Sequence, residues 1–259
     1  MYNFQYANPT RICFGEGQIA RLPELIPAGS RLLVLYGGGS IKQNGVYEQL
    51  TQALAGREWL ECPGIGANPQ YAQLMEAVAL VKRERIDFLL AVGGGSVVDG
   101  TKFVAAAACF ERDDPWEILR DKAPIKAALP LGCVLTLPAT GSESNPASVV
   151  SRGEAKLSFY NPLVQPVFAV LDPATTYSLP PRQVGNGVVD AFVHILEQYL
   201  TFPVGGEVQD RLAEGLLQVL VDNGPRALAE PTNYQVRANL MWAASLALNG
   251  LIGRGVPQD

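Results

Sequence analysis

The chain has 259 residues, of which 48% are hydrophobic and 17% charged, and its net charge is −5. This composition predicts a well-packed globular protein with ample core and excludes a disordered chain. The acidic balance offers no basic field for nucleic acid, and uncharged runs such as Ala238 to Gly253 contain polar residues and fall short of a membrane span. We therefore expect neither a nucleic-acid nor a membrane partner.

The N-terminus and the cysteines indicate in which cellular compartment the protein is expected. Met1 to Phe4 lacks the basic and apolar segments of a signal peptide. Cys13, Cys62, Cys109 and Cys133 are widely spaced and form no Cys-x-x-Cys pair. This pattern favours buried free thiols in a reducing cytoplasm over zinc ligands or disulfides.

In chain order, strands alternate with helices over the first two thirds of the sequence. Phe4 to Phe14, which contains Pro9, predicts an edge strand or hairpin. Short apolar runs then predict strands, and 3.6-residue periodicity predicts helices between them. The expected strands are Arg31 to Tyr36, Glu58 to Cys62, Phe88 to Val92, Gly132 to Leu137 and Val167 to Leu171. The expected helices are Val46 to Leu54, Tyr71 to Arg83, Ser96 to Cys109 and a short turn at Trp116 to Leu119. This alternation predicts an α/β fold with a largely parallel, doubly wound sheet.

After Leu179-Pro180-Pro181 the pattern becomes entirely helical. Helices are expected at Gln183 to Leu200, Val208 to Asp222 and Tyr234 to Leu251. The double proline predicts a boundary between an α/β domain, residues 1–180, and a helical domain that begins in residues 181–259.

The strand Phe88 to Val92 leads into three glycines, Gly93 to Gly95, and then into Ser96, where a helix begins. Glycines leave room for close approach of a ligand, and the unpaired N–H groups of a helix N-terminus attract a phosphate or pyrophosphate. A simpler interpretation is a Ser-x-x-Asp capping box formed by Ser96 and Asp99. The two interpretations are compatible, because three consecutive glycines exceed what a cap needs.

A second glycine cluster, Gly37 to Ser40, ends a different expected strand. Open α/β sheets bind ligands where the carboxyl ends of neighbouring strands meet, although an ordinary turn explains this cluster about as well. In dinucleotide folds an acidic residue after such a strand binds the ribose 2′-hydroxyl. Small neutral residues stand here instead, which favours NADP over NAD.

A polar loop, Thr136 to Asn145, follows the fourth buried strand and contains several hydroxyl and amide side chains. These groups can hydrogen-bond a ligand. They can equally satisfy the backbone of the loop itself, so the loop alone leaves both interpretations open.

His194 is the only histidine, and Asp190 precedes it by one turn of an expected helix. Such a pair can hold one divalent metal, or it can be an ordinary intrahelical pair. Two ligands do not close a four-coordinate site.

Several motifs together resemble the iron-containing (group III) alcohol dehydrogenases, in particular the NADPH-dependent aldehyde reductase and butanol dehydrogenase branch. The resemblance covers essentially the whole chain. Its motifs are Pro9-Thr10-Arg11, Gly93 to Ser96 with Asp99, Thr136 to Asn145, Asp172-Pro173 and Asp190-x-x-x-His194.

The resemblance implies a dinucleotide-binding α/β domain followed by a helical domain, as in dehydroquinate synthase-like folds, with the active site in the cleft between them. It implies that Gly93, Gly94, Gly95 and Ser96 hold the pyrophosphate, and that Gly38, Gly39 and Ser40 lie at the adenosine ribose and its 2′-phosphate. Further implied cofactor contacts are Asn68, Asp99, Thr136, Thr140, Asn145, Lys156 and Leu179. Asp190 and His194 match two of four ligands of an iron or zinc ion.

The implied activity is hydride transfer between NADP(H) and aldehydes or primary alcohols, in a homodimer. No residue is assigned as the general acid. Two alternatives remain at this point: an NAD-dependent, zinc-containing polyol oxidoreductase similar to glycerol dehydrogenase, and a nucleotide-binding module without catalysis.

One feature departs from the family pattern. The family places its two remaining metal-binding histidines beyond the position of Asp259. We therefore expect the chain to be a fragment of a longer protein, the alternative being a naturally short chain with an incomplete metal site.

Overall fold

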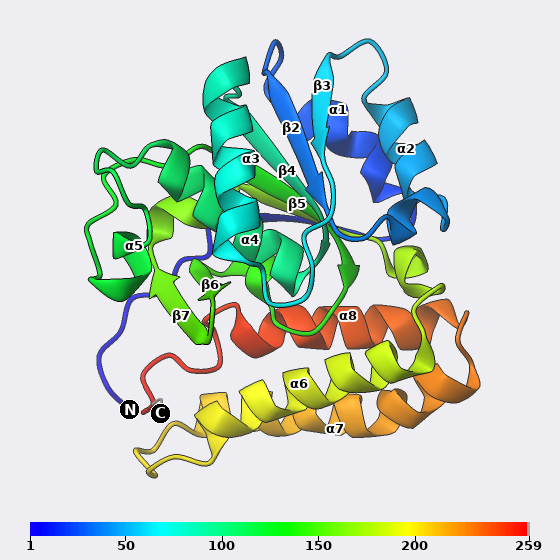
Figure 1. The fold of residues 1–259 in the computed structure, drawn as a ribbon. Helices are drawn as coiled ribbons and strands as arrows, with labels where there is room; N and C mark the ends of the chain where they lie inside the picture. Colours follow the sequence, from blue (N-terminus) through cyan, green and yellow to red (C-terminus); the bar gives the residue numbers. More distant parts are fainter. Residues whose placement is uncertain (258–259) are drawn as a thin grey trace.

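The structure is a computed structural model that describes residues 1–257. Its centre is a six-stranded sheet, with a separate two-stranded hairpin and a group of long helices (Figure 1). The strands are β1 (Arg11–Phe14), β2 (Leu32–Tyr36), β3 (Trp59–Cys62), β4 (Phe88–Gly94), β5 (Leu131–Leu137), β6 (Ala147–Arg152), β7 (Ala155–Tyr160) and β8 (Phe168–Leu171). The α-helices are α1 (Leu22–Leu25), α2 (Val46–Ala53), α3 (Tyr71–Glu84), α4 (Gly95–Ala108), α5 (Glu117–Arg120), α6 (Pro181–Tyr199), α7 (Glu207–Ala229) and α8 (Tyr234–Leu248). Short 3₁₀ turns are η1 (Gln18–Arg21), η2 (Ser40–Lys42), η3 (Ser142–Ser144), η4 (Pro162–Val164) and η5 (Pro173–Thr176).

The sheet has the strand order β1-β8-β5-β4-β2-β3, and every pairing within it is parallel. Side chains of a strand alternate between its two faces. In β2, Leu33 and Leu35 therefore join the core formed with α3 and α4, whereas Leu32 and Val34 join the core formed with α1 and α2. The sheet is thus covered on both faces, which confirms the expected doubly wound α/β fold.

The β6–β7 hairpin was not predicted from the sequence. Its strands are antiparallel, with Arg152 opposite Ala155, and the connecting Gly153 has a positive φ of 59°. The signal was present, because an alternating stretch on each side of a glycine is typical of a hairpin. Strand β6 of the hairpin packs on α4, and β7 packs on α5.

Helices α6, α7 and α8 pack together beside the sheet around their own buried apolar residues (Figure 1). Helix α7 is longer than expected, and it continues through Pro225 to Ala229. Helix α8 ends at Leu248, three residues before the expected end. The two ends of the described chain lie close together, where the Tyr2 N–H donates to the Gly255 carbonyl at 2.8 Å.

Of the two forms expected for Phe4 to Phe14, the structure shows the edge strand, over Arg11–Phe14, where β1 pairs in parallel with β8. Two other expectations need correction. Helix α4 begins at Gly95 rather than Ser96, because β4 extends through Gly94. All four cysteines are free thiols, but Cys62 and Cys109 are half-buried rather than buried.

Among the residues that the structure covers, no helix has both the length and the apolar character needed to cross a membrane.

Candidate active site

A pocket of about 300 Å³ lies where the N-terminus of α4, the polar loop after β5, the β6–β7 hairpin and helix α6 meet. Many of the residues singled out from the sequence line it: Asn68, Gly95, Ser96, Asp99, Thr140, Asn145, Lys156 and His194. Of the remaining lining residues, Ser142 belongs to the polar loop expected from the sequence, whereas Pro69, Ala147, Val149 and Leu248 were not singled out. The fold therefore joins the glycine motif and the histidine, which are about a hundred residues apart in the chain, in one hollow.

Each of the three glycines where β4 passes into α4 has a close packing neighbour. A Cβ on Gly93 would lie 2.6 Å from Val97 Cγ2, and one on Gly94 would lie 3.1 Å from Leu137 Cβ. A Cβ on Gly95 would lie 2.3 Å from Thr140 Oγ1. The three glycines thus let α4 start directly from β4 and pack against the polar loop. They also leave room for a ligand to approach the backbone.

The expected capping box is absent. Helix α4 has Gly94 at its N-cap and no side-chain cap, so the N–H groups of its first turn remain available to a ligand. Asp99 instead points to the polar loop and the hairpin, where it accepts a bond from Ser142 Oγ at 2.5 Å and one from the Val149 N–H at 3.2 Å. Burial raises the pKa of Asp99, and the nearby Lys102 opposes that shift.

Lys102 is a fully buried cation one turn after Asp99, and sequence reasoning missed it. Its ammonium donates to Ser142 Oγ at 2.8 Å, to Asn145 Oδ1 at 3.2 Å and to the Ala147 carbonyl at 2.7 Å. These bonds satisfy all three ammonium donors. Burial lowers the pKa of Lys102 to about 8, against the opposing charge of Asp99. Lys102 thus fixes the polar loop and the first residue of the hairpin against α4.

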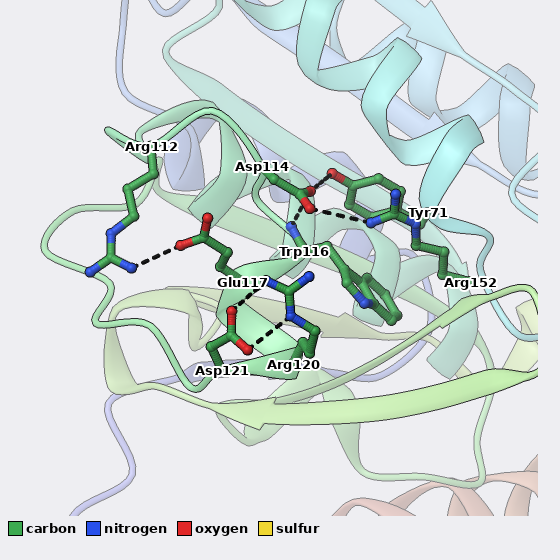
Figure 2. A network of polar contacts seen from close by, with 8 residues as sticks. All are labelled: Tyr71, Arg112, Asp114, Trp116, Glu117, Arg120, Asp121 and Arg152. Atoms are coloured by element: carbon green, nitrogen blue, oxygen red, sulfur yellow. Dashed lines mark hydrogen bonds and ion pairs between the residues drawn. The ribbon is translucent and has the colours of Figure 1, made fainter.

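A second set of contacts holds the hairpin, and Figure 2 shows those among Arg152, Tyr71 and Asp114. The Arg152 guanidinium lies 4.7 Å from the centre of the Tyr71 ring and 3.4 Å from Asp114 Oδ2. The Tyr71 hydroxyl donates to Asp114 Oδ1 at 2.7 Å, and the Ser151 N–H donates to the Pro69 carbonyl at 2.9 Å. These contacts join the hairpin, which carries Val149 and Lys156, to the loop that carries Asn68.

The second glycine cluster lies beside the first. Strand β2 pairs with β4 with Tyr36 opposite Val92, so the loop from Gly37 starts next to Gly93. No neighbour lies within 4 Å of a Cβ placed on Gly38 or Gly39. The loop follows β2, which lies between β4 and β3 in the sheet, and none of Gly38, Gly39 and Ser40 lines the pocket.

Thr136, Leu179 and Asp190, which were also singled out, do not line the pocket. Thr136 is buried at the end of β5, and Leu179 lines a small separate cavity with Pro138 and Val184. Asp190 lies on α6 one turn before His194, outside the pocket lining.

His194 and Asp190 form the expected one-turn pair, with Nε2 of the imidazole 3.6 Å from Asp190 Oδ2. The other ring nitrogen of His194, Nδ1, lies 3.5 Å from Glu197 Oε2. Asp190 raises the pKa of His194, with Glu197 adding to the effect. Imidazole and carboxylate are donors suited to iron or zinc. Within the part of the chain that the structure describes, no group of three or more His, Cys, Asp or Glu is arranged to hold a metal ion. The pair therefore offers two of the donors that a four-coordinate site needs.

Comparison with known proteins gives one consistent result. The family model "Iron-containing alcohol dehydrogenase" matches residues 9–173, and the model of the family's C-terminal part matches residues 185–255. The chain is 61% identical to the NADPH-dependent aldehyde reductase YqhD of Escherichia coli, and the match covers 100% of this chain and 68% of that protein. It is 42% identical to a probable NADH-dependent butanol dehydrogenase of Bacillus subtilis, covering 100% of this chain and 68% of that protein.

Solved structures of members of the same family superimpose on the chain. A crystal structure of Escherichia coli YqhD superimposes with a TM-score of 0.98 at 60% identity, covering 100% of this chain and 67% of that one. An NADH-dependent butanol dehydrogenase A of Thermotoga maritima superimposes with a TM-score of 0.96 at 41% identity, covering 100% and 66%. The chain thus spans about two thirds of the length of these relatives.

Proposed function

The chain belongs to the iron-containing alcohol dehydrogenase family, and from this premise we propose that it transfers a hydride between NADP(H) and an aldehyde or primary alcohol. The observation that carries the proposal is the pocket in which the uncapped N-terminus of α4 and His194 line the same hollow. The relative with 61% identity is named as an NADPH-dependent aldehyde reductase, which supports the choice of cofactor and substrate class.

In this proposal the first-turn N–H groups of α4, at Gly95 and Ser96, bind the pyrophosphate of the dinucleotide. Asp99, Asn145 and Lys156 orient the cofactor from the walls of the pocket, with Asn68 and Thr140 beside them. Asn145 is held by Lys102, and Asp99 is held by Ser142 and the Val149 N–H, which limits the motion of these two side chains.

Asp190 and His194 would hold the divalent metal. When bound, the metal supplies a Lewis acid for the substrate carbonyl, and the dinucleotide supplies the hydride. Pro69, Ala147, Val149 and Leu248 give the pocket apolar surface beside its polar groups, and this surface helps exclude water from the bound substrate.

The test is an assay of the purified protein with iron or zinc. We expect oxidation of NADPH that depends on added short-chain aldehyde, because the pocket joins a nucleotide site to a carbonyl-binding metal site. Oxidation of glycerol with NAD, without aldehyde reduction, would instead support a polyol oxidoreductase. Nucleotide binding without metal or turnover would support a binding module.

Gly95→Ala should weaken NADPH binding by about tenfold, a loss of about one charge-assisted hydrogen bond. The added methyl meets Thr140 at 2.3 Å and must push apart the helix N-terminus and the polar loop. The dissociation constant is measured by quenching of protein fluorescence. Gly215→Ala is the matched control, because no atom lies within 4 Å of its new Cβ. Equal NADPH affinity in both variants would contradict the proposed position of the pyrophosphate.

We further propose a cytoplasmic homodimer. Strand β1 lies at an edge of the sheet, and such an edge offers unpaired backbone groups to a second copy. The four free thiols suit a reducing compartment. Light scattering after size-exclusion chromatography gives the mass of the assembly, and a monomer would contradict the dimer.

A further inference from the structure

The cofactor proposed above must extend to both sides of the α4 N-terminus. The 300 Å³ pocket and His194 lie on the side of β5 and the hairpin. A dinucleotide with its pyrophosphate on Gly95 and its nicotinamide in that pocket therefore places its adenosine on the opposite side. That side is formed by the ends of β2 and β3, next to the open Gly38-Gly39 turn.

An acidic residue is present on this side, although sequence reasoning found only small neutral residues. Glu61 lies on β3, about 20 residues after the β2 turn, where dinucleotide folds carry the acid that binds the ribose 2′-hydroxyl. A free carboxylate there would repel a 2′-phosphate.

Glu61 is not free, because three side chains donate to its carboxylate. Tyr47 donates to Oε1 at 2.5 Å, and Tyr36 donates to Oε2 at 2.5 Å. The Lys42 ammonium donates to Oε2 at 3.0 Å. These donors lower the pKa of Glu61 despite its partial burial, so the carboxylate stays charged and already bonded.

Lys42 is the exposed member of this cluster. It belongs to η2, two residues after Ser40, and its backbone N–H donates to the Gly39 carbonyl at 3.0 Å. Its ammonium lies 4.5 Å from the centre of the Tyr47 ring and 5.4 Å from that of the Tyr36 ring, and 46% of its side chain is exposed. The contact with Glu61 uses one of the three ammonium N–H groups, which leaves donors for an incoming anion.

We propose that Lys42 selects NADP(H) over NAD(H) by binding the 2′-phosphate. Tyr36, Tyr47 and Glu61 hold its ammonium beside the glycine turn and keep the carboxylate from acting as a ribose acceptor. This inference rests on the proposed function, because it assigns one end of the same bound dinucleotide.

The test measures the dissociation constants of NADPH and NADH for Lys42→Met. We expect NADPH binding to weaken by about tenfold, the loss of one charge-assisted contact, while NADH binding stays within about twofold. The dependence of NADPH binding on salt should also decrease, because a charged contact is lost. Lys82→Met, a change of an exposed lysine on α3, is the control and should alter neither constant.

A second variant tests whether Glu61 binds the ribose 2′-hydroxyl instead of only holding Lys42. Glu61→Gln should leave NADH binding unchanged, since the carboxylate does not contact the ribose. A tenfold weakening of NADH binding in Glu61→Gln would overturn this inference alone. Equal changes of the NADPH and NADH dissociation constants in Lys42→Met would do the same. A wild-type protein that binds neither dinucleotide would overturn the proposed function and this inference with it.

Discussion

Replacing His194 by alanine is expected to remove the bound metal and to reduce turnover by at least about a hundredfold, since metal catalysis supplies several kcal/mol of transition-state stabilisation. The imidazole and the Asp190 carboxylate are the two proposed metal donors, and the carboxylate alone holds a metal poorly. NADPH binding should remain within about twofold, because the α4 N-terminus and the polar loop do not depend on the imidazole. Metal content by elemental analysis, NADPH titration and turnover are measured on the same preparations.

Arg182→Ala, an exposed change on the first turn of the same helix, is the control and should retain both metal and turnover. Full metal content and unchanged turnover in His194→Ala would remove this residue from the metal site. Loss of NADPH binding together with the metal would show instead that the substitution disrupts the pocket.

Lys102→Met is expected to destabilise the fold by about 3–5 kcal/mol, the range found when one partner of a buried charged network is removed. Ser142, Asn145 and the Ala147 carbonyl each lose a donor, and the half-buried Asp99 and the buried Glu143 lose their neighbouring cation. Methionine fills a similar volume, so the effect reports the lost bonds and charge rather than a cavity. The free energy of unfolding is obtained from urea denaturation.

Lys82→Met serves again as the matched control, because it removes an exposed lysine from the neighbouring helix and should change stability by no more than about 0.5 kcal/mol. Equal stability of the two variants would show that the Lys102 network does not hold the polar loop.

The same network predicts a dependence of stability on pH. The pKa of Lys102 falls from 10.5 to about 8 in the folded chain, so between these values the unfolded chain binds more protons than the folded one. The stability of the wild type relative to Lys102→Met should therefore rise as the pH increases from about 8 to about 10.5. Urea denaturation of both proteins across this interval gives the difference, and a constant difference would contradict the lowered pKa.

The strands of the sheet were predictable because they are continuous apolar runs that end at glycine or proline. Leu89 to Val92 is entirely buried, and no helix-forming period competes with it. The β6–β7 hairpin was missed because many of its side chains are polar or exposed, which weakens the apolar signal. Its Gly153 turn was the remaining clue.

The candidate site was predicted unevenly, because short motifs were visible and long-range contacts were not. The sequence spacing of Ser96 and Asp99 indicates a capping box, yet Asp99 bonds to Ser142 and Val149, more than forty residues away. Nothing in the local sequence around Lys102 reveals its acceptors on the polar loop. Glu61 was overlooked for a similar reason, since its place beside the glycine turn follows from the pairing of β3 with β2.

The most direct test of the account is a crystal structure of the protein with bound NADPH. We expect the pyrophosphate against the backbone N–H groups of Gly95 and Ser96, the nicotinamide in the pocket beside His194, and the adenosine over the Gly38-Gly39 turn. A nucleotide bound away from Gly94, Gly95 and Ser96 would contradict it.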